Sequence, residues 1–238
     1  MVVGTRLRTE LGAAHYDVPS SIAGQLADAV RRGRDDAAGW ARIHPTGSER
    51  RFGRDALAAL DAPPIDEAAR RDLDAVLAAQ RTRTAELDRA TLHHDARTGW
   101  DAWDGALAQI RREQGPEQAK LAADLVQAST WRTHDVVATA KEQFGRQRPF
   151  EVDSSISTVI PPPVGNASYP SGHASGAYAA ALVLGAFLPD RARELEDAAA
   201  QVAYSRVYAG VHFPSDVVAG AYVASRVAAD VLRRGNIG

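Results

Sequence analysis

The 238-residue sequence lacks cysteine, is poor in aromatic residues and has no long hydrophobic run, and each absence excludes a class of protein. Without cysteine there is no disulfide, no catalytic thiol and no cysteine-ligated metal site. Aromatic residues make up only 6% of the chain, while alanine, arginine, aspartate and leucine dominate, which favours helix over sheet. No segment shows the alternation typical of strands. We therefore expect an all-α protein.

The longest uncharged apolar run, residues 176–188, is shorter than the roughly 20 residues needed to cross a bilayer, so we expect a buried core helix there and no membrane span. The first residues lack the apolar middle region of a signal peptide. As written, the chain is expected to be cytoplasmic; if an upstream signal peptide has been removed, it is secreted or periplasmic. Arginine and aspartate are interspersed at a net charge of -2, which argues against a nucleic-acid partner.

Apolar spacing predicts a bundle of helices, with proline and glycine marking its interruptions. The predicted helices lie near 22–30 (closed by Gly33), 65–97, 100–112, 117–145, 172–187, 190–209 and 215–233. Residues 1–19 look irregular, residues 34–64 suggest short helices or loops, and residues 150–169 suggest a functional or mobile loop. We predict one all-helical domain over 1–238, in which 1–115 is scaffold without a recognised motif and 116–238 is the motif-bearing core. The active site is expected at helix ends.

The first of three short clusters with chemical meaning contains two cations. Lys141 and Arg148 lie seven residues apart, so they would project from the same side of a helix that continued to Pro149. A lysine point charge and a planar guanidinium suit a phosphate dianion. Taken alone, the pair is explained more simply as a solvated helix face.

The second cluster, Pro170-Ser171-Gly172-His173, opens a predicted helix directly after the loop. Ser171 is a good N-cap, Gly172 permits close backbone approach, and the free N–H groups of a helix start bind anions. His173 at that start could protonate a leaving-group oxygen. An ordinary cap with a surface histidine explains the same residues about equally well.

The third cluster combines a cation, a histidine and a carboxylate. Arg206 lies near the end of one predicted helix, His212 follows a turn, and Asp216 stands four residues further on. A nucleophilic imidazole needs an acceptor on its other nitrogen, and a nearby carboxylate supplies one. In isolation, a packed turn histidine and a capping aspartate are the better explanation of this cluster. Together, the three clusters suit phosphoryl transfer through a histidine nucleophile without a metal.

In order, the clusters read Lys, six residues, Arg-Pro; Pro-Ser-Gly-His; and Ser-Arg, five residues, His, three residues, Asp. This pattern resembles the signature of the type 2 phosphatidic acid phosphatase superfamily, which also contains vanadium-dependent haloperoxidases, and matches it at every position. The flanks are most similar to the soluble class A bacterial acid phosphatases. Ala174 stands where those enzymes often have threonine, and alanine there is familiar in the haloperoxidases. The resemblance covers residues 141–216 and, loosely, the following helix.

The resemblance implies a role for each matched residue. His212 would attack phosphorus to form a phosphohistidine, and Asp216 would orient it. His173 would protonate the leaving oxygen and then activate water. The groups that would hold the phosphoryl oxygens are Lys141, Arg148, Ser171, the Gly172 amide and Arg206. No metal or other cofactor is implied, and vanadate would bind the phosphate site.

We therefore predict a metal-independent phosphatase acting on phosphate monoesters, with diphosphates as a further substrate class, through a phosphohistidine. One alternative is a vanadium-dependent haloperoxidase, against which the size of the chain argues. Another is a lipid or prenyl diphosphate phosphatase at a membrane surface, which the lack of predicted spans disfavours. A binding module with a dead site is disfavoured because every catalytic position is intact. The expected partners are a small phosphorylated substrate and, from the resemblance to soluble relatives, a second copy of the chain.

Other polar and aromatic residues receive a structural interpretation. His93, His94 and Asp95 would diverge too widely on a helix to share one metal, so we expect them on a solvated face. His134 is expected on a helix surface. The four tryptophans are expected to pack in the core or between helices; they are Trp40, Trp100, Trp103 and Trp131.

Overall fold

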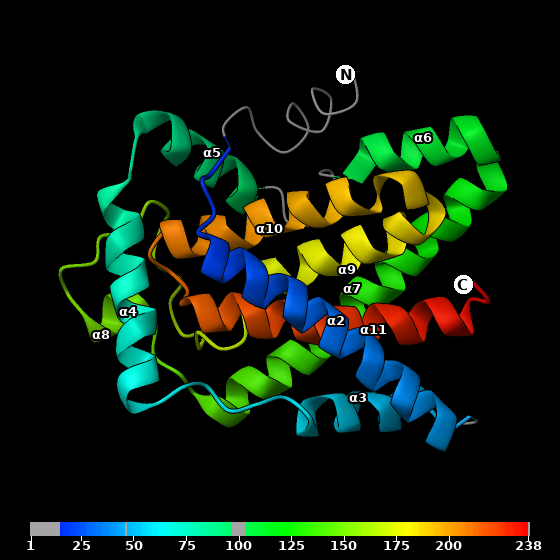
Figure 1. The fold of residues 1–238 in the computed structure, drawn as a ribbon, viewed down its shortest axis with the longest axis horizontal. Helices are drawn as coiled ribbons and strands as arrows, with labels where there is room; N and C mark the ends of the chain where they lie inside the picture. The colour runs from blue at the N-terminus through cyan, green and yellow to red at the C-terminus, as the bar shows by residue number, and fades with distance from the viewer. Residues whose placement is uncertain (1–14, 46, 97–102, 238) are drawn as a thin grey trace.

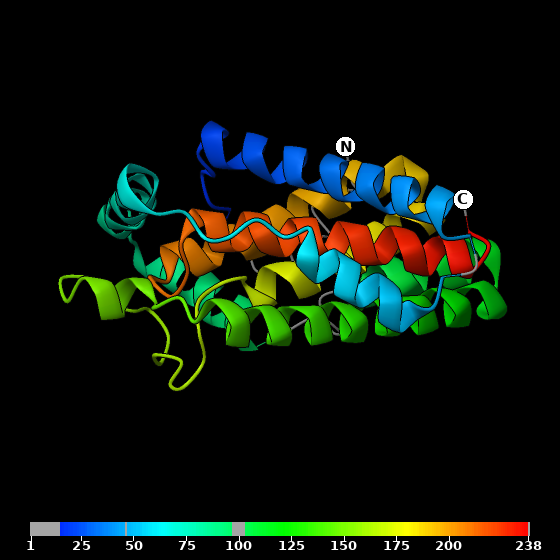
Figure 2. The ribbon, with the colours of Figure 1, turned by 90° about the horizontal axis from the view of Figure 1, so that it is seen from below.

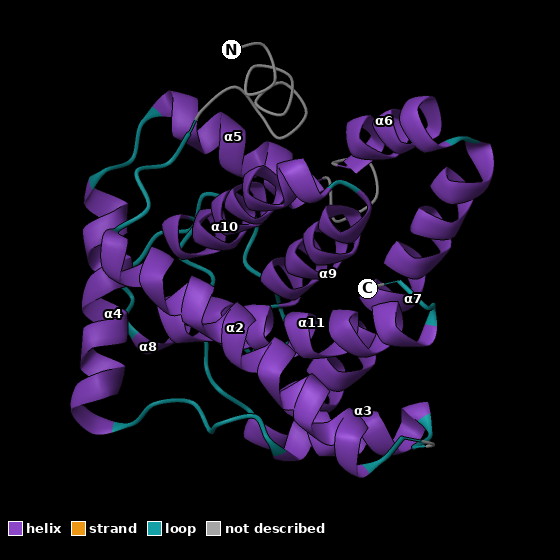
Figure 3. Cartoon of the chain, turned by 45° about the vertical axis from the view of Figure 1, so that its right-hand side comes forward, coloured by secondary structure: helices purple, strands orange, loops and turns teal. Residues whose placement is uncertain are grey.

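A computed structural model describes residues 15–45, 47–96 and 103–237 of the chain. Helices joined by loops make up these residues, and no strand occurs among them (Figure 3), so the prediction of an all-α fold is confirmed. In chain order the elements are α2 (Ser20–Ile43), α3 (Glu49–Ala58), α4 (Asp66–Arg81), α5 (Ala85–Ala96), α6 (Asp104–Gln114), α7 (Pro116–Phe144), α8 (Pro149–Val152), α9 (Gly172–Phe187), the 3₁₀ turn η2 (Pro189–Arg191), α10 (Ala192–Tyr208) and α11 (Pro214–Arg234).

Helix α9 forms the centre of the bundle. It packs against α7, α10 and α11, and α2 lies across α11 on the outer side (Figures 1 and 2). Between residues 174 and 187 only Gly176 and Ala186 are not buried. A helix without a charged face has to be covered on every side, so the core position expected for the run 176–188 is confirmed.

The first predicted helix does not end at Gly33, because α2 continues to Ile43. Gly33 faces α11, where an added Cβ would lie 2.7 Å from the Tyr222 carbonyl oxygen and would also clash with the Ser225 hydroxyl. The glycine therefore permits two helix backbones to approach closely and does not act as a helix stop. This close approach is the reason that the sequence-based boundary was wrong.

The helix predicted over 65–97 is two helices, because the chain breaks between α4 and α5. Arg83 in the break donates to the Tyr208 carbonyl oxygen at 2.8 and 3.2 Å, and the Thr84 N–H donates to the Tyr208 hydroxyl at 2.9 Å. The Thr84 hydroxyl also accepts from the Leu87 N–H at 3.2 Å, which makes Thr84 the N-cap of α5. Contacts with α10, which the local apolar pattern does not encode, thus set the break.

Helix α7 ends at Phe144, within one residue of the predicted end at 145, and does not continue to Arg148. Gly145 adopts the left-handed conformation (φ 56°) typical of a helix C-terminus, so Arg148 lies beyond α7 and directly before α8. The two cations therefore do not share a helix. Beyond α8, the remainder of residues 150–169 contains no regular element, as predicted for a loop.

The tryptophan prediction is correct for Trp40 and Trp103, which are buried, and wrong for Trp131, which is 63% exposed on α7. Trp100 lies outside the described residues, as do residues 1–14 of the segment predicted to be irregular and the first residues of the predicted helix 100–112. Every described helix is either too short or too polar to serve as a bilayer span.

The close approach of α2 and α11 predicts a large difference between two glycines of α2. Gly33→Ala should lower the free energy of unfolding by about 1–3 kcal/mol or more, because the added methyl meets the Tyr222 backbone. Gly24→Ala, whose Cβ would have no atom within 4 Å, should raise it by about 0.5–1 kcal/mol through helix propensity alone. Urea denaturation of both variants measures the difference, and equal effects would contradict the proposed packing.

Candidate active site

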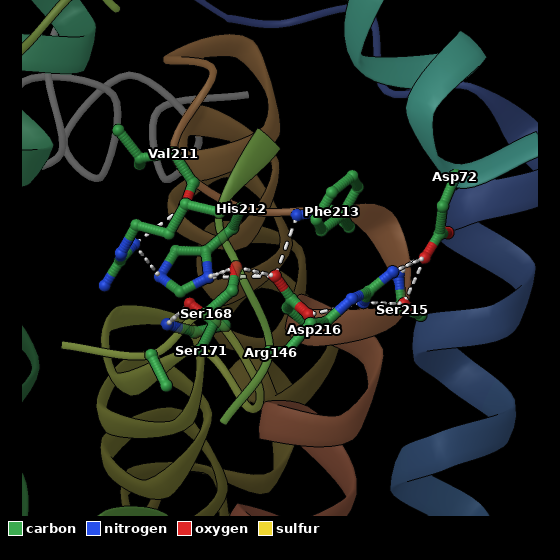
Figure 4. A network of polar contacts seen from close by, with 12 residues as sticks. Asp72, Arg146, Ser168, Ser171, Val211, His212, Phe213, Ser215 and Asp216 are labelled. Carbon is green, nitrogen blue, oxygen red and sulfur yellow. Dashed lines mark hydrogen bonds and ion pairs between the residues drawn. The ribbon is translucent and has the colours of Figure 1, made fainter. Parts of the chain in front are cut away.

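The residues of the three clusters converge where several helix ends meet. Figure 4 shows Ser171, His212 and Asp216 among them. The elements that carry them are the last turn of α7, the segment before α8, the first turns of α9 and α11, and the end of α10 with the turn after it. Backbone hydrogen bonds hold these segments together: the His212 N–H donates to the Arg206 carbonyl at 3.2 Å, and the Ser171 N–H donates to the Asp216 carbonyl at 2.9 Å.

His212 and Asp216 form a buried pair. Nδ1 of His212 lies 3.2 Å from Oδ2 of Asp216, and the two side chains are 4% and 0% exposed. Because a carboxylate only accepts, we assign the imidazole proton to Nδ1, which leaves the lone pair on Nε2. That Nε2 atom lies 3.3 Å from Nη1 of Arg148, so the free nitrogen of the imidazole faces a cation.

Burial and charge keep this imidazole neutral. Burial lowers the pKa of His212 most; the hydrogen bond and charge of Asp216 raise it, nearby Arg148 and Lys141 lower it again, and the resulting pKa is about 3. Burial alone would raise the pKa of Asp216, but its contacts with His212, Arg146 and Ser168 hold that pKa below its ordinary value. The pair therefore consists of a neutral imidazole with an unprotonated Nε2 and an ionised carboxylate.

Lys141 and Arg148 hold the chain that leads into α9. The Lys141 ammonium donates to the Ala167 carbonyl oxygen, and Arg148 donates through Nε to the Asn166 carbonyl at 2.9 Å and through Nη1 to the Val211 carbonyl at 2.7 Å. Burial, aided by the charge of Arg148, lowers the pKa of Lys141 to about 8, although Asp216 raises it. Two cations from separate segments are thus fixed beside His212.

Arg206 and His173 carry buried side-chain nitrogens that have no hydrogen-bond partner among the described residues. Arg206 is 1% exposed, and its Nη2 pairs with Oδ1 of Asp95 at 2.9 Å, whereas its Nε and Nη1 have no hydrogen bond within the described part of the chain. His173 Nε2 lies 3.6 Å from the same carboxylate oxygen, too far for a hydrogen bond. Buried polar nitrogens are rarely left unsatisfied, so these atoms indicate a place for a polar group that the described part of the chain does not supply.

The start of α9 contributes a backbone anion site. The Ser171 hydroxyl accepts from the Ala174 N–H at 3.4 Å and so caps the helix. Gly172 is its first residue, and the N–H groups of a first turn have no partner inside the helix. Helix α11 packs closely against this turn at Gly220. An added Cβ on Gly220 would lie 2.7 Å from the Ser171 carbonyl oxygen, so the glycine permits the two backbones to approach.

Four residues at the site were missed by sequence reasoning. Arg146 binds Asp216 Oδ1 at 2.6 Å, Ser168 donates to Asp216 Oδ2 at 2.5 Å, Asp72 binds Arg146 at 2.9 Å, and Asp95 binds Arg206. The positions of Arg146 and Ser168 inside the motif region were a usable signal. Asp72 and Asp95 lie far upstream in helices with no local indication of a role.

The expectation of a solvated face for residues 93–95 was wrong. His94 is 3% exposed and packs against Tyr16, and Asp95 contacts Arg206, so this turn of α5 covers one side of the site. Burial, with the nearby positive groups, lowers the pKa of His94 to about 4. His134, by contrast, is exposed on α7 as predicted.

Comparison with known proteins finds a similarity to one family over the same region. Residues 126–234 match the model of the PAP2 superfamily, which confirms the family resemblance found in the three clusters. Over 120 residues, 49% of this chain and 46% of the relative, the chain is 38% identical to a non-specific acid phosphatase of Salmonella typhimurium. Over 106 residues, 43% of this chain and 40% of the relative, it is 34% identical to an acid phosphatase of Zymomonas mobilis. The chain thus aligns with less than half the length of these relatives.

Solved structures agree on the fold. A transmembrane PAP2 type phosphatidylglycerolphosphate phosphatase from Bacillus subtilis has a TM-score of 0.51 at 19% identity, over 78% of this chain and 92% of that one. LpxE from Aquifex aeolicus has a TM-score of 0.52 at 23% identity, over 68% of this chain and 94% of that one. At these identities the likeness concerns the helical architecture alone.

The low pKa of Lys141 predicts how anion binding depends on pH. The affinity for inorganic phosphate should fall as pH rises through about 8, because Lys141 then loses its proton and its charge. Lys141→Met should weaken binding by about tenfold or more and remove this decline. Calorimetric titration of both proteins measures the effect. Phosphate changes its own protonation in the same way in both experiments, so a difference between the two proteins reports on Lys141.

Lys120→Met is the matched control, because Lys120 is the other lysine of the chain and is exposed on α7 beside Asp124. It should retain the affinity and the pH dependence of the wild type. A decline that persists unchanged in Lys141→Met would assign the titration to another group.

Proposed function

We propose that this chain, whose residues 126–234 match the PAP2 superfamily, is a metal-independent phosphatase that hydrolyses small phosphate monoesters through a phosphohistidine. One observation carries the proposal: His212 is buried and neutral, its Nδ1 is held by Asp216, and its Nε2 lies 3.3 Å from Nη1 of Arg148. Arg148 belongs with Lys141 and Arg206 to a group of three buried cations that we call the cation cluster. This is the arrangement that a nucleophilic imidazole requires.

The cation cluster supplies the positive charge that a phosphoryl group needs. Lys141 and Arg148 lie beside His212. Nε and Nη1 of Arg206, which have no partner within residues 15–45, 47–96 and 103–237, are donors available to phosphoryl oxygens. The first-turn amides of α9 add backbone donors to the same side. Preorganised donors of this kind stabilise the charge that develops in phosphoryl transfer, the role that a metal ion fills in many other phosphatases.

In the first half-reaction, the Nε2 lone pair of His212 forms a bond to phosphorus while the bond from phosphorus to the ester oxygen breaks. The leaving oxygen takes a proton from His173, and Asp216 stabilises the positive charge that develops on the imidazole. In the second half-reaction, a water oxygen attacks phosphorus and gives its proton to His173. The N–P bond then breaks, which returns neutral His212 and releases inorganic phosphate.

The protonation of His173 sets the direction of the pH dependence. Burial, followed by the charge of Arg206, lowers its pKa to about 4 in the absence of substrate, although Asp95 raises it. A bound phosphate dianion favours the protonated form and raises this pKa. The general acid is therefore present at low pH and lost as pH rises, so we propose an acidic optimum.

The substrate class follows from the relatives. Two of them are named non-specific acid phosphatase and acid phosphatase, at 38% and 34% identity, which supports monoester hydrolysis over haloperoxidase chemistry at the same ligands. The alignment covers less than half of each relative. The range of monoesters that this chain hydrolyses is therefore part of the proposal. Diphosphates remain a second substrate class for the same cation cluster.

The test is hydrolysis of p-nitrophenyl phosphate from about pH 4 to about pH 9 with a chelator present. We expect activity that survives the chelator, is highest at acidic pH, is inhibited by vanadate and is lost in His212→Ala by a factor of about 10³ or more. Acid-labile phosphate trapped on the wild type, and absent from the variant, would identify the intermediate.

His134→Ala is the matched control, since His134 is exposed on α7 and should leave kcat unchanged. Full activity in a folded His212→Ala protein would refute the phosphohistidine. Halide-dependent oxidation by peroxide after vanadate loading, with no phosphatase activity, would favour the haloperoxidase alternative.

A further inference from the structure

A second carboxylate lies behind the His212–Asp216 pair, on a helix outside the family match. Oδ1 of Asp216 accepts from Nη1 of Arg146 at 2.6 Å, and Nη2 of the same guanidinium binds Oδ2 of Asp72 at 2.9 Å (Figure 4). Asp72 belongs to α4, whereas the family match begins at residue 126. The side chains of Asp72 and Arg146 are each 11% exposed, so the chain of charges is largely withdrawn from water.

Ser215 holds Asp72 and Arg146 together at the end of this network that lies away from His212. Its hydroxyl donates to Asp72 Oδ2 and accepts from Arg146 Nη1 at 2.7 Å, and its N–H donates to Asp72 Oδ1 at 3.3 Å. The Arg146 guanidinium also stacks on the Phe213 ring, with 4.0 Å from Cζ to the ring centroid. Arg146 is thus held on several sides, and Asp72 is one of the groups that fix its position relative to Asp216.

We propose that Asp72 is a positioning residue for the reaction: by binding Arg146 it keeps the negative charge of Asp216 available to His212. The inference rests on the proposed function. Its basis is the unbroken line of contacts from Asp72 through Arg146 and Asp216 to Nδ1 of His212.

Charge balance gives the physical reason. An arginine in direct contact with a buried carboxylate offsets most of its charge, and a carboxylate that is offset stabilises an imidazolium poorly. Asp72 binds the other nitrogen, Nη2, of the Arg146 guanidinium. The Asp72–Arg146 pair therefore has a net charge close to zero. Asp216 then retains charge for the nitrogen that becomes positive when His212 bonds to phosphorus. The other charged groups that face His212, Lys141 and Arg148, are both cations and cannot take this role.

The prediction distinguishes binding from bond formation. Inorganic phosphate uses the cation cluster, which Asp72 does not touch in any contact described above. Vanadate, as a transition-state analogue, also bonds to His212 and places positive charge on the imidazole. Removing the charge of Asp72 should therefore weaken vanadate binding and lower kcat together, while the affinity for phosphate stays nearly constant.

The experiment compares Asp72→Asn with the wild type and with Asp74→Asn. Asp74 is exposed on the same helix, so its substitution makes the same change in net charge away from the chain of contacts. In Asp72→Asn we expect kcat to fall and the vanadate inhibition constant to rise, each by about tenfold, with the phosphate inhibition constant within about twofold of wild type. Asp74→Asn should match the wild type in all three quantities.

Equal weakening of phosphate and vanadate, or no change in either, in a folded Asp72→Asn protein would show that the ion pair only joins α4 to the bundle. If circular dichroism shows that Asp72→Asn does not fold, Arg146→Lys is measured by the same criteria, because a lysine cannot span both carboxylates. A wild type that neither hydrolyses p-nitrophenyl phosphate nor binds vanadate would refute the proposed function, whereas an active wild type without the split would refute only the role of Asp72.

Discussion

The rest of the site depends on one requirement, which is that the fully buried carboxylate of Asp216 must have its lone pairs satisfied. Oδ1 accepts from Arg146, while Oδ2 accepts from Ser168, the Phe213 N–H and His212. The donors come from the segment after α7, the segment before α9 and the turn before α11. Satisfying one carboxylate therefore fixes the relative positions of the segments that carry the three motifs.

The same low-dielectric environment explains the electrostatics. Lys141 and Arg148 lie beside a neutral histidine, and Arg206 acts on Arg148. Burial lowers the pKa of all three cations because their charge is poorly solvated. Carbonyl oxygens and Asp95 accept hydrogen bonds from part of their donors. Among the described residues, Nε and Nη1 of Arg206 have no acceptor, so they are available to an anion. A site of this kind gains most when a dianion enters, since the ligand relieves repulsion among the cations and satisfies their free donors.

The N-terminal half contributes more than scaffold. It lies outside the match to the PAP2 superfamily, yet α4 supplies Asp72 behind the nucleophile and α5 supplies Asp95 beside Arg206 and His173. The two carboxylates hold opposite sides of the site from helices that precede the motifs by many residues. Substitutions in this half are therefore expected to alter the chemistry without touching any motif residue.

The sequence by itself determined the all-α class, helices α7, α9, α10 and α11 and the motif residues of the site, because apolar periodicity is local and the motif spacing is specific. Only the tertiary structure decided where α2 ends, that residues 65–97 form two helices, and that Asp72, Asp95, Arg146 and Ser168 join the site. Helix packing, backbone approach at Gly33 and the need to pair buried charges act between segments far apart in the chain. A local sequence pattern does not encode these long-range effects.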